Sequence, residues 1–427
     1  MNRAVYYTAS DLAEKGLENL PDELVSNRHL IYSSPATLAF NSPGAEGFGV
    51  KRAGLAIPGS VMLLVAPGCC GRNTSLISAL PAYKDRFFYL NMDETDVVTG
   101  RHLKKIPQAV EEVVNCLEEQ PSVVMICITC VDALLGTDME RVCRRAEERV
   151  GLPVRPCYMY ALTREGRKPP MVHVRQSLYS LLEPRNKKGS VVNLLGFFAP
   201  LIDDCELYVY LKDIGVRTIH EISREPDLQS FYMMAEANFN LVLHPEARMA
   251  ASDLEERLKI PSIELTRLYQ IDKIRSQYRA LGKVLGVSFD DEHDFQWAKD
   301  VVDAFRSAHP DAVFSIGECM NGDPFELALA LTGYGFRVAE IFGTLQGENF
   351  GYLRRLAAVS PDTRIYSNME PTMLYYDPTN CPVTVSVGKD AGYYHPESPV
   401  LIWNSDVQPY GYAGLRRFME ALSEVLR

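Results

Sequence analysis

Two short apolar segments, each followed by a loop that carries cysteine, constrain the fold most strongly. Residues Val61–Val65 and Val123–Ile128 are rich in β-branched side chains and bounded by glycine or proline, as is typical of buried parallel strands. Between them, a segment with apolar side chains at helical spacing begins at Pro107, which we expect in the first turn of a helix. A strand, a helix and a second strand form a crossover unit. Cys70 and Cys130 then follow the carboxyl ends of two parallel strands, at the edge of the sheet where α/β proteins bind ligands.

The same alternation of strand-like and helix-like segments continues along all 427 residues. It predicts an α/β protein of three Rossmann-like domains, each a parallel sheet flanked by helices. We expect an amino-terminal domain over residues 1–185, a middle domain over 186–290, and a carboxyl-terminal domain over 291–427 that ends in a closing helix. Near the amino terminus, Asp11 is the expected N-cap of a first helix.

Composition excludes several classes of function. The net charge is −11 and no long basic segment occurs, which argues against nucleic acid or an anionic membrane surface as the main partner. The sequence starts without a secretory signal and has no run of 18 apolar residues, so we expect a cytoplasmic protein with no membrane span. The usual dinucleotide, P-loop, zinc-hydrolase and serine-hydrolase motifs are absent from the sequence.

The ten cysteines are too few for a disulfide framework in a chain of this length. Taken alone, Cys127-Ile-Thr-Cys130 is a weak motif, and alternation along the strand predicts a buried, structural Cys127. Cys69 and Cys70 are adjacent, and adjacent residues seldom bind one metal together, so one of them is expected to be structural. Two cysteine loops at one sheet edge nevertheless favour a metal site that contains Cys70 and Cys130.

These loops resemble those of the nitrogenase component 1 family, which includes the dark-operative protochlorophyllide reductase and the nickel-tetrapyrrole cyclase of methanogens. The family pattern H-G-P-x-G-C is similar to Val65-Ala-Pro-Gly-Cys-Cys70, and C-P-x-x-L-I-G-D-D is similar to Cys130-Val-Asp-Ala-Leu-Leu-Gly-Thr-Asp138. The segment Met92–Gly100 resembles the family's D-E-x-x-x-V-F-G-G. Weaker similarity runs over most of the chain, including Asn240–Pro245 and Leu254–Pro261 of the middle domain.

The resemblance implies an iron–sulfur cluster. A [4Fe–4S] cluster requires four ligands, and one chain offers Cys70 and Cys130, so the site is expected to be shared between two subunits. The partner would be a second copy of this chain or a different component 1-type chain. A separate ATP-hydrolysing iron–sulfur reductase would supply electrons, as the resemblance also implies.

The sequence departs from nitrogenase at two ligand positions. The third cluster cysteine has no counterpart in Phe40–Ala45, which argues against the larger eight-iron cluster. The cysteine that holds nitrogenase's catalytic cofactor is also absent, and Leu243 and His244 lie in that region. His244 and His395 are weak catalytic candidates, because a lone histidine after a strand is more often structural. Beside the cluster cysteine, Arg72 is a possible contact for a cluster or an anionic substrate, or else a surface ion-pair partner.

Three hypotheses for function follow. In the first, the chain is an oxidoreductase subunit that passes electrons through the cluster to a substrate bound between domains. In the second, it is a scaffold or carrier on which a metallocofactor is assembled without catalytic turnover. In the third, it is a non-redox relative that keeps the fold and binds a small ligand. The sequence does not identify the substrate, and it leaves a homodimer and a mixed assembly open.

Overall fold

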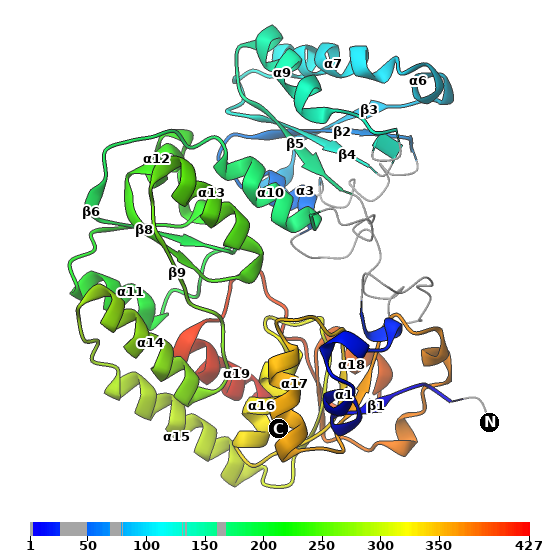
Figure 1. The fold of residues 1–427 in the computed structure, drawn as a ribbon, viewed down its shortest axis with the longest axis vertical. Helices are drawn as coiled ribbons and strands as arrows, with labels where there is room; N and C mark the ends of the chain where they lie inside the picture. Colours follow the sequence, from blue (N-terminus) through cyan, green and yellow to red (C-terminus); the bar gives the residue numbers. More distant parts are fainter. Residues whose placement is uncertain are drawn as a thin grey trace. The chain divides into compact units, whose positions relative to one another are not determined.

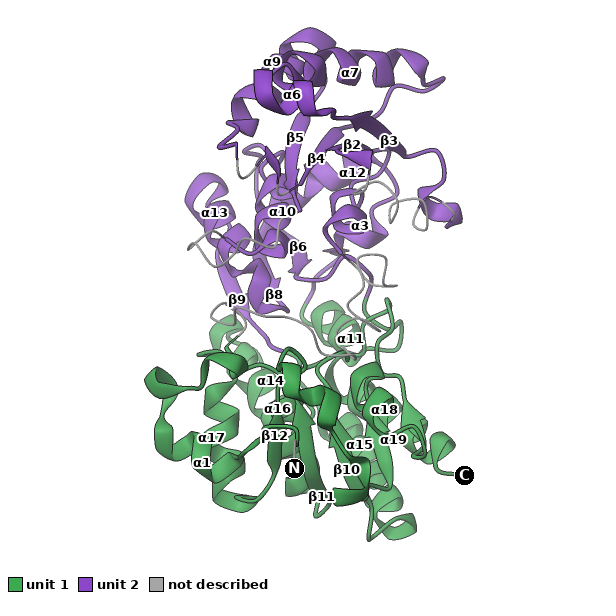
Figure 2. Cartoon of the chain, turned by 90° about the vertical axis from the view of Figure 1, so that its right-hand side faces the viewer, with its two compact units in different colours: residues 1–45, 201–214, 267–427 green, residues 46–200, 215–266 purple. Residues whose placement is uncertain are grey.

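The structure is a computed structural model that describes residues 3–25, 49–68, 78, 80–129, 131–132, 135–159 and 168–427. The chain divides into two compact units (Figure 2). Unit 1 contains residues 1–45, 201–214 and 267–427, and unit 2 contains residues 46–200 and 215–266. Among the described residues, no helix combines the length and apolar character that crossing a bilayer requires.

The first sheet of unit 2 is parallel and carries helices on both faces (Figure 1). In spatial order its strands are β3 (Phe87–Asn91), β2 (Val61–Ala66), β4 (Val124–Ile128) and β5 (Val154–Tyr158). Alternate strand residues pack against two different helix pairs, because successive side chains of a strand point to opposite faces. One pair is α7 (His102–Cys116) and α9 (Met139–Val150), and the other is α3 (Val50–Gly54) and α10 (Pro170–Tyr179).

The second sheet of unit 2 is also parallel. In spatial order its strands are β7 (Thr218–His220), β6 (Lys188–Leu195), β8 (Ala237–Val242) and β9 (Ser262–Glu264). Helices α12 (Leu228–Met233) and α13 (Arg248–Leu258) contribute to the core beside it. The same continuous core includes residues of α10, which contacts both β5 and α13. Helix α10 thus links the two sheets of this unit.

The sheet of unit 1 has six strands, of which only the two-residue β1 runs antiparallel. In spatial order they are β1 (Tyr7–Thr8), β12 (Arg364–Tyr366), β11 (Arg337–Phe342), β10 (Val313–Ile316), β13 (Val385–Val387) and β14 (Val400–Leu401). Among the described residues of this unit, the helices longer than five residues are α1 (Ala9–Lys15), α11 (Glu206–Asp213), α14 (Ile271–Leu285), α15 (Glu292–Ala308), α16 (Pro324–Gly333), α17 (Phe350–Val359), α18 (Lys389–Tyr394) and α19 (Gly411–Val425).

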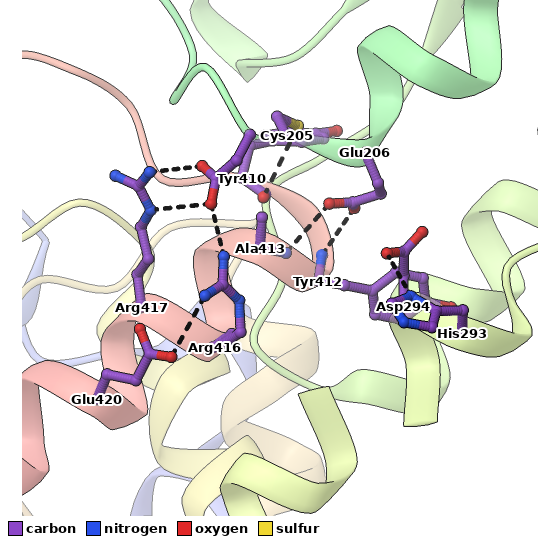
Figure 3. A network of polar contacts seen from close by, with 11 residues as sticks. Cys205, Glu206, His293, Asp294, Tyr410, Tyr412, Ala413, Arg416, Arg417 and Glu420 are labelled. Atoms are coloured by element: carbon purple, nitrogen blue, oxygen red, sulfur yellow. Dashed lines mark hydrogen bonds and ion pairs between the residues drawn. The ribbon is translucent and has the colours of Figure 1, made fainter. Parts of the chain in front are cut away.

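The carboxylate of Glu206 fixes the start of α19. Its two oxygens accept hydrogen bonds from the backbone N–H groups of Tyr412 at 2.7 Å and Ala413 at 3.1 Å (Figure 3). A carboxylate at this position satisfies amides that lack partners within the helix and interacts favourably with the helix dipole. A side chain on Gly411, whose φ is +62°, would lie 1.8 Å from Glu206 Oε1, so this turn requires glycine. Residues about 200 positions apart in the sequence are thereby joined within unit 1.

All three sheets share one topological feature. In each sheet, the parallel strand that comes first in the chain lies in the interior of the sheet. The next strands in the chain are added on one side of it and the later strands on the other side, so the strand order reverses beside that first strand. The reversal lies between β2 and β4, between β6 and β8, and between β10 and β13. Ligands of open α/β sheets bind at the carboxyl ends of the strands at such a switch point. The fold therefore offers three candidate positions for a site.

The predicted fold class, parallel sheets flanked by helices, is confirmed. Two local predictions are wrong. Thr8, and not Asp11, is the N-cap of α1, and Asp11 instead completes a capping box by accepting from Thr8 N. Pro107 lies inside α7, which begins five residues earlier at His102. The division into domains at residues 185 and 290 stays a prediction.

Candidate functional site

The predicted cluster residues Cys69, Cys70, Arg72 and Cys130 lie outside the described residues. The strands that lead to them are described. β2 and β4 are direct neighbours, with Val65 paired to Ile128, and adjacent strands of a sheet lie about 4.8 Å apart. Both cysteine loops therefore leave the sheet from neighbouring strands at the switch point of the first sheet. The convergence of Cys70 and Cys130 themselves stays a prediction.

Three buried polar side chains belong to the surroundings of Cys130. Thr129 and Asp132 are near Cys130 in the sequence, and His102 contacts Asp132. Thr129 Oγ1, Asp132 Oδ2 and His102 Nε2 are enclosed, and none has a hydrogen-bond partner among the residues that the structure describes. His102 Nδ1 donates to the carbonyl oxygen of Asp96 at 3.0 Å, and Nε2 faces Asp132 Oδ1 at 3.5 Å. Burial raises the pKa of Asp132, while attraction to His102 and a hydrogen bond from Thr137 oppose that rise.

Unpartnered buried polar groups are costly, and an apolar core would exclude them. Their presence on both sides of Cys130 in the sequence indicates that this part of the chain is built around a further polar or charged group. Thiolate ligands with hydrogen-bonding groups nearby are what an iron–sulfur cluster requires. The residues present therefore fit the group that the family resemblance implies.

Cys127 packs on the face of the sheet that α3 and α10 cover. It is fully buried in β4 and lies opposite Cys157 of β5 in the strand register. The pKa of the Cys157 thiol is raised well above its usual value, first by the hydrogen bond with Cys127 and then by burial. The predicted burial of Cys127 is confirmed. Cys127 belongs to the same C-x-x-C motif as Cys130 but packs within the core. A substitution of Cys127 is therefore a suitable control for a substitution of Cys130.

His244 lies at the switch point of the middle sheet, just beyond β8. Its side chain is 39% exposed, and Nδ1 accepts a hydrogen bond from the backbone N–H of Glu246 at 3.3 Å. The ring contacts the edge of Phe197, which follows the neighbouring strand β6, with centroids 5.6 Å apart. The imidazole thus stands half exposed at a sheet edge, with Nδ1 turned toward the backbone of Glu246.

Arg175 of α10 fixes the backbone beside His244. Its Nε and Nη2 atoms donate to the carbonyl oxygen of Gly196 at 3.1 and 2.6 Å, and Nη1 donates to Glu246 Oε2 at 2.8 Å. The guanidinium group also lies over the ring of Phe198, 4.6 Å from its centroid. Gly196 has φ +142°, and a side chain there would lie 2.7 Å from the backbone nitrogen of His244. The loop that follows β6 and the loop that follows β8 are therefore packed against each other at this switch point.

His395 has a different environment. It is 4% exposed, and its Nε2 atom contacts Glu340 Oε1 and lies 2.8 Å from the hydroxyl of Tyr376. Glu340 Oε1 also accepts hydrogen bonds from Tyr376 at 2.8 Å and from Ser315 at 3.0 Å. A histidine enclosed in such a network favours the structural interpretation over a catalytic one.

The switch point of the unit 1 sheet is filled by residues that the sequence analysis missed. Asp390 Oδ2 and Oδ1 accept from the backbone N–H groups of Glu318 at 2.7 Å and Cys319 at 3.2 Å. Asn368 Nδ2 donates to Asp390 at 2.8 Å and to Glu318 at 3.0 Å. Burial, followed by the neighbouring charge of Asp390, raises the pKa of Glu318 to about 7. The sequence signal that would have found this site is Ile316-Gly317-Glu318, in which an acidic residue follows a buried strand after a single glycine.

Comparison with known proteins gives a consistent result. Residues 46–427 match the family model described as nitrogenase component 1 type oxidoreductase. The nitrogenase iron-molybdenum cofactor biosynthesis protein NifE of Nostoc sp. (strain PCC 7120 / SAG 25.82 / UTEX 2576) is 26% identical over 257 residues, which are 56% of this chain and 52% of that protein. NifE of Rhizobium meliloti (strain 1021) is 32% identical over 133 residues, 30% of this chain and 28% of that one.

In these alignments the chain spans about half the length of the curated relatives, or less. The solved structure of nitrogenase Cp1 at pH 6.5 superimposes with a TM-score of 0.71 over 96% of both chains. At 16% sequence identity, that likeness establishes the fold alone.

Proposed function

Because the chain belongs to the family of nitrogenase component 1 type oxidoreductases, we propose that it holds an iron–sulfur cluster through Cys70 and Cys130 and that a metallocofactor is assembled on it. The pairing of β2 with β4 carries the first part, since it brings the starts of both cysteine loops to one switch point. The similarity to NifE proteins, named for iron-molybdenum cofactor biosynthesis, favours assembly over turnover.

Two cysteines leave a [4Fe–4S] cluster half ligated. A second subunit, either another copy or a different component 1-type chain, would supply the remaining ligands across a shared interface. When bound, such a cluster stores and transfers single electrons. The contribution of this chain is to keep two thiolates in place, to exclude water around them, and to provide the buried polar groups of Thr129, Asp132 and His102 beside them.

The middle sheet supports a role in assembly. His244 stands at its switch point, in the region where the family resemblance places a cofactor cysteine. Iron–sulfur clusters prefer soft thiolate ligands, so a neutral imidazole would hold such a cofactor less tightly. Weak retention suits a protein that passes its cofactor on. Arg175 and Gly196 would keep this edge in one conformation during transfer.

Anaerobic purification, followed by iron and sulfide analysis, tests cluster binding. We expect both elements in the wild-type protein and their loss in Cys70→Ala and Cys130→Ala. Cys127→Ala is the matched control and is expected to keep the cluster, because Cys127 packs against Cys157 in the core. A colourless protein that cannot be reconstituted with iron and sulfide would contradict the proposal and favour the non-redox hypothesis.

Electron transfer to a substrate is the second candidate function, favoured by the family's description as oxidoreductases. The two candidates differ in stoichiometry. An assembly protein releases its metallocofactor once per loading to a recipient apoprotein, whereas a reductase consumes substrate repeatedly when an ATP-hydrolysing iron–sulfur partner supplies electrons. Measuring metal transferred and product formed per protein, with the partner and ATP present, separates them. Many products per protein would overturn the assembly role.

A further inference from the structure

A pocket in unit 1 lies at the amino ends of β11 and β12, the opposite end of these strands from the switch point described above. Its volume is about 320 Å³, at the lower end of the range of roughly 300–1,000 Å³ that small-molecule sites occupy. Tyr6 from the chain beside β1 forms part of the wall, and Cys381 and Asn380 also line it. Nothing in the proposed function uses this pocket.

Two arginines line the pocket. Arg337 is exposed at the start of β11, and its guanidinium group forms no ion pair or hydrogen bond with another described residue. Arg364, at the start of β12, donates from Nη1 to the carbonyl oxygen of Asn380 at 3.1 Å and lies 5.1 Å from the centroid of the Tyr6 ring. A guanidinium group presents five donors in a planar fork. Both arginines therefore have donors left for a ligand.

We propose that this pocket binds the oxyanion group, phosphate or carboxylate, of a small molecule. Paired N–H groups of a guanidinium match the two oxygens of such a group. Asp362 is the one carboxylate among the described residues that line the pocket, and it is exposed, so these residues carry a net charge of +1 from two arginines and one aspartate. An anion is the ligand that this balance favours.

Cys381, which also lines the pocket, carries no charge that would repel an anion. Cys381 is 7% exposed, and burial together with neighbouring Glu340 raises the pKa of its thiol to about 12 even though Arg364 and Arg337 oppose that rise, so the thiol stays neutral. The arginines are therefore not present to stabilise a thiolate.

Calorimetric titration of the full-length protein with inorganic phosphate, and separately with malonate, in buffers matched for ionic strength with chloride, tests the proposal. We expect saturable binding of at least one anion, and its Kd is expected to rise at least tenfold in Arg337→Gln. Arg354→Gln removes an exposed arginine outside the pocket and is expected to leave the Kd unchanged. Preference for phosphate or for malonate then identifies the source of the oxyanion.

A second variant changes the charge in the other direction. Asp362→Asn removes the carboxylate of the pocket and is expected to tighten binding about threefold. Lack of saturable binding to the wild type, equal weakening by Arg337→Gln and Arg354→Gln, or weaker binding in Asp362→Asn would each overturn the proposal. Iron and sulfide content is expected to be the same in all these variants, so the outcome is independent of the cluster proposal.

Discussion

The switch points of the middle sheet and of the unit 1 sheet have the same strand topology but different contents. In the middle sheet, the imidazole of His244 is half exposed, and Arg175 donates hydrogen bonds to the neighbouring backbone at Gly196. In the unit 1 sheet, Asp390 accepts from the backbone amides of Glu318 and Cys319, the groups that would otherwise be free to bind a ligand. Topology thus marks where a ligand can bind, and the side chains decide whether that position is open.

The largest effect is expected from crowding the filled switch point. In Gly317→Ala the new Cβ would lie 1.8 Å from Asp390 Oδ1, so the carboxylate must leave its amide partners, at a cost of more than about 3 kcal/mol. Urea unfolding followed by tryptophan fluorescence measures this, because Trp297 and Trp403 both belong to unit 1. Gly351→Ala, with open space around it, is the control and should change stability by under about 1 kcal/mol. Equal stability of the two variants would show that the switch point is not filled as described.

Removing the support of the open switch point should have the next largest effect. Arg175→Gln leaves the carbonyl oxygen of Gly196 without its two charged hydrogen bonds, and we expect a loss of about 2–4 kcal/mol. Hydrogen exchange of the peptide that contains residues 196–198 should become faster. Arg248→Gln breaks an exposed ion pair with Glu264 and should cost under about 1 kcal/mol. Unchanged exchange in Arg175→Gln would mean that this edge is ordered by other contacts.

The raised pKa of Glu318 predicts a pH dependence. The folded protein keeps its proton up to about pH 7, whereas the unfolded chain releases it near pH 4.5, so stability falls as pH rises through this interval. The loss attributable to Glu318 is at most about 3 kcal/mol. Glu326, whose pKa burial also raises to about 7, contributes with the same sign. Urea midpoints of unit 1 at pH 5 and pH 8 should differ less in Glu318→Gln than in the wild type, and an unchanged difference would contradict this prediction.

The smallest effect on stability is expected at His244. Its side chain is half exposed, and in His244→Asn the amide oxygen can still accept from the N–H of Glu246, so the thermal midpoint should shift by the equivalent of under about 1 kcal/mol. The proposed function predicts a lower metal content in the same variant after cofactor loading. A large loss of stability with full metal content would instead assign His244 a structural role.

Local sequence patterns predicted much of the fold. The apolar runs Val61–Val65 and Val123–Ile128 predict β2 and β4 to within one residue at each end, because buried parallel strands carry a local signal. Strand β1 was missed because it has two residues and exists only through pairing with β12, more than 350 positions later. Strand β3 and helix α6 (Glu94–Thr99) were also missed.

For the candidate sites as well, features that depend on a local pattern were predictable, and features that depend on the order of strands were not. The burial of Cys127 follows from alternation along a single strand, and the structure confirms it. The grouping of Glu318, Asn368 and Asp390 depends on the order of four strands in a sheet, which no local pattern contains. Cys70 and Cys130 were selected by resemblance to a family, and their arrangement stays a prediction.

The placement of residues 201–214 in unit 1, where Glu206 anchors them to α19, has a consequence for experiments that divide the protein. The chain passes from one unit to the other four times, after residues 45, 200, 214 and 266. Neither unit is therefore a continuous piece of polypeptide, and no single truncation yields either one intact. Fragments cut near residue 200 or 266 should aggregate or remain unfolded, and synthesis must reach the final helix before unit 1 can be completed.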